Sequence, residues 1–190
     1  ALLDLPVDIF NQPTLNSFIA LGKSKAREVR NRVSEVLRHD NQELQSNSEL
    51  VEKVLLPKSK AEMLLPIKVQ NYTDFYSSIE HATNVGTMFR DPDNALLPNW
   101  KHIPVGYHGR ASSIIPSGVP IHRPKGQTKA PDAELPSFGP TKRLDFELET
   151  AFITCKENQL GENISTVDAD DHIFGFVLFN DWSARDVQVW

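Results

Sequence analysis

The sequence has little of several features that define particular classes of protein. Its 190 residues include a single cysteine, Cys155, so no disulfide can form within the chain and a disulfide-stapled scaffold is excluded. The longest apolar run, at 173–179, is far shorter than the roughly 20 residues that a membrane-spanning helix needs. The first ten residues lack the basic stretch followed by an apolar stretch that marks a signal peptide. We therefore expect a cytoplasmic protein that does not associate with membranes.

Several motifs of common enzyme classes are also missing. The sequence contains no GxSxG serine-hydrolase motif, no P-loop and no GxGxxG dinucleotide-binding motif. Its six histidines show no paired spacing such as HxxxH, so a zinc site is not predicted. With 20 Lys and Arg against 25 Asp and Glu, and no basic stripe interleaved with aromatic residues, nucleic-acid binding is not predicted either.

The negative charge is concentrated at one end of the sequence. Residues 141–190 contain 4 basic and 10 acidic side chains, whereas the formal net charge of the whole chain is -5. Such a block is either a solvated acidic surface or a set of carboxylates gathered around a cation. The charge count alone leaves both interpretations open.

The spacing of apolar residues divides the chain near residue 66. Helical spacing predicts a helix over 13–39, which Gly22 breaks or bends, then a loop at 40–49 and a short helix at 50–56 that ends at Pro57. From residue 104 to residue 140 the chain carries 7 of its 13 prolines and 5 of its 9 glycines, which indicates turn-rich β structure. We therefore expect a helical lead-in over 1–66 and a β-rich domain over 67–190, in an α+β, β-dominated fold.

Two strands are predicted in the acidic part of the chain. Apolar and mostly acidic residues alternate from 144 to 152, which is typical of a strand with one apolar and one acidic face. Glu147 and Glu149 then project from the same face about 7 Å apart, where a hard divalent cation would offset their repulsion. The run 173–179 is apolar throughout, which is typical of a strand covered on both faces, and Asp181 follows it closely.

Two helix starts are predicted beside polar residues. Ser77 and Glu80 have capping-box spacing, which puts Asp74 in the loop before a helix and His81 in its first turn. The positive end of a helix dipole favours a neutral imidazole there, the form that a general base requires. Ser183 and Asp186 have the same spacing, and a helix beginning there places Arg185 and Gln188 on one face.

These residues lie in strings that resemble the fumarylacetoacetate hydrolase family. The resemblance extends in order from about Phe10 to Trp190, and its most specific strings are Tyr72–Ser78, His81–Gly86 with Met88–Arg90, Leu97–Trp100, Pro104–Ser113, Leu144–Glu149 and Phe179–Asp186. Enzymes of this family hydrolyse the carbon–carbon bond of a β-diketone. The branch that the chain resembles converts fumarylacetoacetate to fumarate and acetoacetate, the last step of tyrosine and phenylalanine catabolism.

The resemblance implies a role for each matching site residue. It implies a Ca²⁺ or Mg²⁺ ion held by four carboxylates, those of Asp74, Glu147, Glu149 and Asp181. It implies that His81 activates the attacking water and that Arg185 and Gln188 face the developing oxyanion. The residues implied to line the pocket for a dicarboxylate diketone substrate are Tyr76, Arg90, Tyr107 and Gln188.

The resemblance also implies a fold and an assembly. Family enzymes form a mixed β-sandwich roll, usually as a homodimer. They carry a small SH3-like barrel before the matched region, and a histidine-orienting Glu and a site Lys after it, so residues 67–190 correspond to the N-terminal part of the catalytic domain. Two alternatives stay open: another activity of the superfamily, such as acylpyruvate hydrolysis or decarboxylation, and a non-catalytic module that binds a divalent cation.

Overall fold

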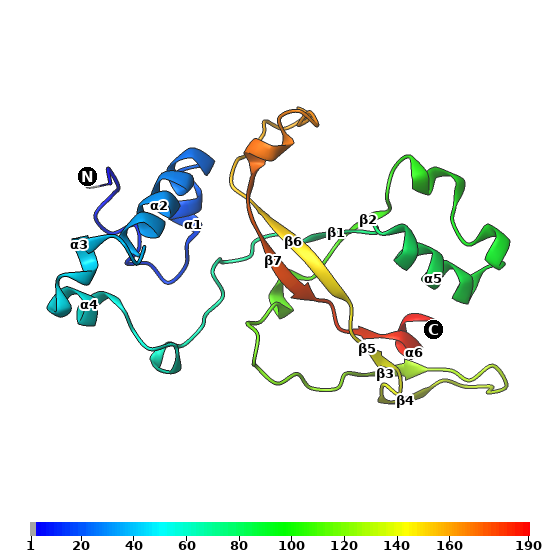
Figure 1. The fold of residues 1–190 in the computed structure, drawn as a ribbon. Helices are drawn as coiled ribbons and strands as arrows, with labels where there is room; N and C mark the ends of the chain where they lie inside the picture. Colours follow the sequence, from blue (N-terminus) through cyan, green and yellow to red (C-terminus); the bar gives the residue numbers. More distant parts are fainter. Residues whose placement is uncertain (1–2) are drawn as a thin grey trace. The chain divides into compact units, whose positions relative to one another are not determined.

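The computed structural model describes residues 3–190, so the first two residues of the predicted lead-in lie outside it (Figure 1). The chain divides into two compact units. The first consists of residues up to Pro66 together with Gly118–Trp190, and the second of Ile67–Ser117. Among the described residues, no helix combines the length and apolar character needed to cross a membrane.

The first unit begins with helices. They are α1 (Asn16–Ile19), α2 (Lys23–Val36), α3 (Gln42–Gln45) and α4 (Ser48–Val54), followed by the 3-10 turn η1 (Lys58–Lys60). The predicted break at Gly22 is confirmed: its φ of 86° lies in the left-handed region, and Gly22 separates α1 from α2. The predicted loop at 40–49 contains α3, because Asn41 caps that helix by accepting a hydrogen bond from the Glu43 amide at 2.8 Å.

Helices α1 and α2 pack against strand β7 (Ile173–Asn180) of the same unit. The rings of Phe18 and Phe174 meet edge to face with centroids 6.1 Å apart. Lys23, the first residue of α2, forms an ion pair with the Asp170 carboxylate and donates to the Asp170 carbonyl at 2.8 Å. The short helix α1 and the longer helix α2 are thus fixed to β7 and to the segment before it by an aromatic contact and an ion pair.

Strands in the first unit form antiparallel pairs. β3 (Lys125–Thr128) pairs with β4 (Ser137–Pro140), β5 (Leu144–Asp145) with β8 (Ser183–Ala184), and β6 (Leu148–Thr154) with β7. The predicted single strand from 144 is therefore two strands, interrupted at 146–147. The short helix α6 (Arg185–Gln188) directly follows β8.

The last two strand pairs share one register. Leu148 lies opposite Asn180 in β6–β7, and Asp145 lies opposite Ser183 in β5–β8. Continuing either register across the interruption places Glu147 opposite Asp181. The two pairs therefore form one antiparallel ribbon, and opposite residues project to the same side of it.

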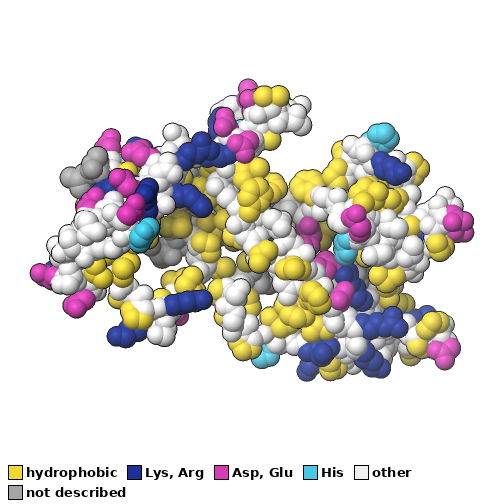
Figure 2. All heavy atoms as spheres, in the orientation of Figure 1, with side chains coloured by type: hydrophobic (Ala, Val, Ile, Leu, Met, Phe, Trp, Pro, Cys, Tyr) yellow, Lys and Arg dark blue, Asp and Glu magenta, His cyan; other side chains and the backbone are white. Residues whose placement is uncertain are grey.

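One side of this ribbon is apolar and exposed, and we call it the apolar face. Its residues alternate along the two strands and are Phe146, Leu148, Phe152, Phe176, Leu178 and Trp182. Leu178 is 80% exposed and Leu148 is 69% exposed. Hydrophobic side chains are visible at the surface along β6 and β7 in Figure 2. The predicted strand at 173–179 is confirmed, but the prediction that it is covered on both faces is wrong for the described residues.

Few side chains are buried in the described part of the chain. The buried apolar residues are Ile9, Phe18, Ile19, Leu44, Ala82 and Ala95, and the buried polar ones are Thr141 and His172. Backbone hydrogen bonds, caps and ion pairs therefore carry much of the local order.

The second unit consists of a small hairpin, a helix and short 3-10 turns. β1 (Thr73–Phe75) pairs antiparallel with β2 (Gly106–His108), and α5 (Ile79–Phe89) follows β1. The 3-10 turns of this unit are η2 (Pro92–Asn94), η3 (Pro98–Lys101) and η4 (Ala111–Ser113). A further 3-10 turn, η5 (Ala169–His172), belongs to the first unit. Asp74 therefore lies on a strand and not in the loop that was predicted for it.

The fold class agrees with the prediction in its coarse form. The described chain is mixed α and β, with N-terminal helices and four two-stranded sheets. The β-sandwich roll, and the division into 1–66 and 67–190, stay predictions.

Candidate functional site

The side of the ribbon opposite the apolar face carries carboxylates, and we call it the acidic face. Asp145, Glu147 and Glu149 alternate along one strand of the ribbon, and Asp181 lies opposite Glu147 in register. Residues two apart on a strand, and residues opposite each other, share a face. The register thus gathers four carboxylates that the sequence alone places in two separate segments.

A side-chain hydrogen bond interrupts the ladder at the centre of the acidic face. The Asp181 amide donates to the Glu147 carbonyl at 3.0 Å, as in a regular antiparallel pair. The Glu147 amide, however, donates to Oδ1 of Asn180 at 3.1 Å instead of to a backbone carbonyl. Asn180 thereby fixes the backbone of Glu147 at the point where β5 ends and β6 has not yet begun.

Arg185 supplies positive charge to the acidic face. Its guanidinium donates through Nε to Asp145 at 3.1 Å and through Nη2 to Glu147. It also donates through Nη1 to Oε1 of Gln188 at 3.1 Å, so the predicted shared face of Arg185 and Gln188 is confirmed. The side chains of Arg185 and Glu147 are only 18% and 13% exposed, so solvent screens their ion pair weakly.

Two opposing effects act on the pKa of Arg185. Partial burial lowers it, while the hydrogen bonds that Arg185 donates to Asp145 and Glu147, and the negative charges of these two carboxylates, raise it. The raising effects win, so the pKa of Arg185 lies above its ordinary value and Arg185 stays charged at every physiological pH.

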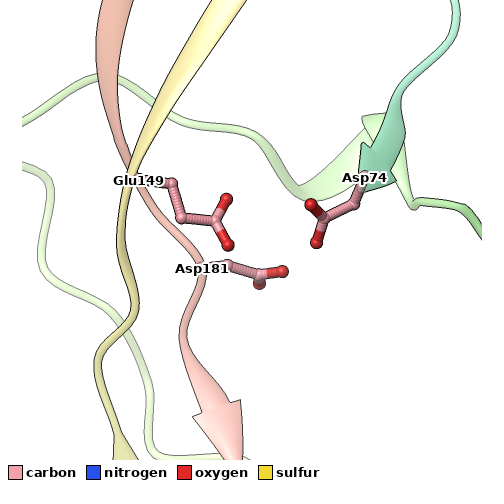
Figure 3. A group of neighbouring side chains, drawn as sticks. All are labelled: Asp74, Glu149 and Asp181. Carbon is pink, nitrogen blue, oxygen red and sulfur yellow. The ribbon is translucent and has the colours of Figure 1, made fainter. Parts of the chain in front are cut away.

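Glu149 and Asp181 lie side by side on the acidic face. One carboxylate oxygen of Glu149 and one of Asp181 are within 4.8 Å of each other, and both side chains are half-buried. Figure 3 shows them beside each other on the ribbon, and it also labels Asp74, which lies on β1 of the second unit. Glu149 and Asp181 of the first unit are carboxylates that could contribute ligands to a metal ion, and Asp74 of the second unit offers a ligand of the same kind. Hard cations such as Ca²⁺ and Mg²⁺ prefer such oxygen donors.

In the second unit the β1–β2 hairpin fixes Asp74. Asp74 lies opposite Tyr107 in register, and the Tyr107 hydroxyl donates to Oδ2 of Asp74 at 2.7 Å. Asp74 is half-buried, and the bond orients its carboxylate while one oxygen still has lone pairs to offer.

His81 lies in the first turn of α5, as predicted, but the cap is one residue later than the predicted Ser77. Ser78 is the cap: its Oγ accepts from the His81 amide at 3.3 Å and donates to Glu80 at 3.1 Å. The ring of Tyr76 lies 5.0 Å from the His81 ring, centroid to centroid. The structure thus brings together two of the predicted site residues in this unit.

Arg90 follows α5 at its C-terminal end. Its Nη1 donates to the Ala95 carbonyl at 2.8 Å, which holds the side chain against the next turn of the chain. This hydrogen bond uses one of the five N–H groups of the guanidinium. The other N–H groups point in other directions, because the five are arranged as a planar fork.

The second predicted capping box is wrong. α6 begins at Arg185 without a side-chain cap, and Ser183 lies on β8. Asp186 instead accepts hydrogen bonds from the Thr141 hydroxyl and, at 2.8 Å, from the Lys142 amide. Sequence reasoning missed Asp145, Asn180 and Asp186 because each acts on a residue about 33 to 45 positions away, a separation that only strand pairing closes.

Two models of known protein families match the chain. A family model described as "Fumarylacetoacetate (FAA) hydrolase C-terminal" matches residues 70–190, and one described as "Fumarylacetoacetase N-terminal" matches residues 2–66. The chain belongs to the fumarylacetoacetate hydrolase family.

Individual relatives are similar over nearly the whole chain. It is 56% identical to the fumarylacetoacetase of Caenorhabditis elegans over 184 residues, which are 96% of this chain and 44% of the relative. It is 53% identical to the Homo sapiens fumarylacetoacetase over 183 residues, 96% of this chain and 44% of the relative. It is 50% identical to the Oryza sativa fumarylacetoacetase over 181 residues, 95% of this chain and 42% of the relative. The chain therefore spans less than half the length of these relatives.

Proposed function

We propose that this protein is a cytoplasmic enzyme that hydrolyses fumarylacetoacetate to fumarate and acetoacetate, as the final step of tyrosine and phenylalanine catabolism. The identity of 50–56% to fumarylacetoacetases supports the substrate. The observation that carries the proposal is the acidic face, where Glu149 and Asp181 lie together and Arg185 is held beside them. A carbon–carbon hydrolase of a diketone needs both elements: carboxylates for a cation and donors for an oxyanion.

The proposed cofactor is one Ca²⁺ or Mg²⁺ ion. Its proposed ligands are the carboxylates of Asp74, Glu147, Glu149 and Asp181. The donor set fits, because all four are hard oxygen ligands and the acidic face carries several carboxylates besides the two that Arg185 binds. A bound ion would supply Lewis-acid polarisation of the diketone and would stabilise the negative charge of the leaving group.

His81 is the proposed general base. The His81 imidazole, at the start of α5, takes a proton from water, whose oxygen then bonds to the carbonyl carbon that becomes the fumarate carboxylate. The carbon–carbon bond breaks next, and the acetoacetate carbon receives a proton. Ser78 supports this role because its cap fixes the backbone of His81, and Tyr76 supports it because its ring packs beside the imidazole.

Arg185 and Gln188 are the proposed donors to the tetrahedral oxyanion. Gln188 accepts from Arg185 through Oε1, so its amide presents Nε2 as a donor on the opposite side. A charged guanidinium and an amide donor that are held together before the reaction need no reorganisation when charge develops.

The proposed pocket residues select a dicarboxylate. Arg90 offers a cation for a substrate carboxylate, while Tyr76 and Tyr107 offer rings and hydroxyl groups, and Gln188 offers its amide. We also propose that residues 67–190 form the N-terminal part of a β-sandwich-roll domain after a lead-in at 1–66, and that the enzyme is a homodimer.

The test measures turnover by the full-length protein. With Ca²⁺ or Mg²⁺ present, the diketone absorbance of fumarylacetoacetate should disappear with equal release of fumarate and acetoacetate, and a chelator should stop the reaction. An acylpyruvate is the comparison substrate, and faster turnover of it would replace the proposed activity with the other superfamily activity. Cation binding without turnover of either compound would favour a non-catalytic module.

A further inference from the structure

The guanidinium of Arg185 is anchored on three sides. Asp145 accepts from Nε at 3.1 Å and lies 3.1 Å from Nη2, Glu147 accepts from Nη2, and Gln188 accepts from Nη1 at 3.1 Å. A planar guanidinium held along three edges has one orientation. The first of these acceptors, Asp145, has no role in the proposed function described above.

The backbone fixes Asp145 at a position from which its carboxylate can accept a hydrogen bond from Arg185. Asp145 lies opposite Ser183 in the β5–β8 pair, and the Arg185 amide donates to the Arg143 carbonyl at 2.9 Å. Both ends of the Asp145–Arg185 contact are thus tied to the same short ladder. Because strand pairing already places both backbones, the contact costs less conformational entropy than one between two mobile side chains would.

Asp145 and Glu147 have different surroundings. The Asp145 side chain is 49% exposed, whereas that of Glu147 is 13% exposed and lies on the acidic face beside Asp181. Of the two carboxylates described as accepting from Arg185, Glu147 would remain without Asp145. The guanidinium would then rotate toward Glu147, because no acceptor would keep its Nε edge in place.

We propose that Asp145 is a positioning residue, which holds the Nε edge of Arg185 so that the remaining N–H groups face the developing oxyanion. This inference rests on the proposed function, in which Arg185 is an oxyanion donor. Asp145 does not touch the substrate in this role, so its loss affects transition-state stabilisation and leaves substrate binding nearly intact.

The test compares Asp145→Leu with Asp145→Asn in the full-length, cation-loaded protein. Asp145→Leu should lower kcat about tenfold with KM changed by less than about twofold, because a donor misplaced by a fraction of an ångström weakens chiefly the transition state. Asp145→Asn should recover most of the loss, since its Oδ1 still accepts from Nε. Asp132→Asn, at an exposed turn between β3 and β4, removes the same charge and should leave kcat unchanged.

A second measurement does not depend on activity. The Nε–H proton of Arg185, followed by NMR, should exchange slowly with solvent in the wild-type protein and at least about tenfold faster in Asp145→Leu, since a hydrogen-bonded donor is protected. In an Arg185→Lys background, which lacks Nε, Asp145→Leu should cost no further activity.

The outcomes separate the two ideas. An inactive wild-type protein refutes the proposed function, while the Nε–H exchange still tests the positioning contact. An active wild-type protein whose kcat and Nε–H exchange are unaffected by Asp145→Leu overturns the positioning role alone. An equal rise in KM, or a loss that Asp145→Asn fails to recover, also overturns it.

Discussion

Gln188 shows how one hydrogen bond decides the chemistry of a side chain. Its Oε1 accepts from Arg185 at 3.1 Å, which leaves the Nε2 side of the amide as a donor. Gln188→Glu would keep the contact with Arg185 and strengthen it by charge, but it would replace the donor with a second acceptor.

We therefore predict that Gln188→Glu lowers kcat about 100-fold, the typical cost of removing one oxyanion donor. Gln188→Met, which removes both the acceptor and the donor, should cause a loss of similar size in steady-state kinetics of the full-length protein. A Gln188→Glu variant with wild-type kcat would show that Nε2 has no part in the reaction.

His81 gives a second prediction at the residue scale. His81→Ala should abolish hydrolysis, because general-base catalysis contributes about 10²- to 10⁴-fold and the proposed mechanism has no other base. Ca²⁺ and Mg²⁺ affinity, measured by calorimetry, should stay near the wild-type value, because the proposed ligands are all carboxylates. His39→Ala, at an exposed position between α2 and α3, is the control and should retain full activity. Wild-type turnover by His81→Ala would remove His81 from the mechanism.

Helix α5 depends on a glycine in its interior. A Cβ on Gly86 would lie 2.2 Å from the Ala95 carbonyl oxygen, the same oxygen that accepts from Arg90. Alanine normally stabilises a helix interior by about 1 kcal/mol over glycine. Here the backbone of Ala95 would have to move, and overpacking costs about 1–3 kcal/mol.

We predict that Gly86→Ala destabilises the protein by about 1 kcal/mol or more, measured by urea denaturation. Asn84→Ala, at an exposed position of the same helix, should stabilise it by a few tenths of a kcal/mol. If Gly86→Ala is also stabilising, the close approach of α5 to Ala95 does not exist in solution.

The hydrogen bonds between Asp186 of α6 and the segment before β5 predict how stability depends on pH. The hydrogen bond from Thr141 and that from the Lys142 amide hold the pKa of Asp186 below its ordinary value of 3.8. A lowered folded-state pKa adds stability above the unfolded pKa, and this stability is lost as pH falls through the folded-state value.

Asp186→Asn should therefore be less stable than the wild type from about pH 5 upward, with the difference shrinking below pH 3.8. Denaturation midpoints across pH 2.5–7 would measure it, with Asp132→Asn as the exposed control. A stability difference that does not change with pH would mean that the negative charge of Asp186 does not contribute to its stabilising hydrogen bonds with Thr141 and Lys142.

The elements show which parts of the fold the sequence can predict. Alternation from residue 144 correctly predicts two chemically different faces, since the period of a strand is fixed by its backbone. It does not predict the break at 146–147, because that break depends on the Asn180 side chain, 33 residues from Glu147. Helix existence was predicted for α2, α4 and α5, but caps shifted by one residue, as at Ser78, because neighbouring serines offer the same chemistry.

The candidate site was predictable in part for the same reason. Arg185 and Gln188 are close in sequence, and helical spacing was enough to predict their contact. The contact of Arg185 with Asp145 was not predictable, because it requires the β5–β8 register. Local periodicity is encoded locally, whereas pairing between distant segments is decided by the whole packing.

At the scale of the whole molecule, the apolar face differs from an ordinary protein surface. Isolated apolar residues are common at surfaces, but here six large side chains share one side of a ribbon, four of them on β6 and β7. Contiguous exposed apolar surface binds hydrophobic dyes and drives association.

We predict that a polypeptide of residues 1–190 binds the dye ANS and self-associates in analytical ultracentrifugation. Replacing Phe176 and Leu178 by Thr, which keeps strand propensity, should lower dye fluorescence severalfold and shift the molecules toward monomer. The control replaces Leu160 and Val167 by Thr, because both are almost fully exposed but lie in the loop between β6 and β7, away from the apolar face. An equal effect of both pairs would show that total surface hydrophobicity, and not the contiguous face, governs the association.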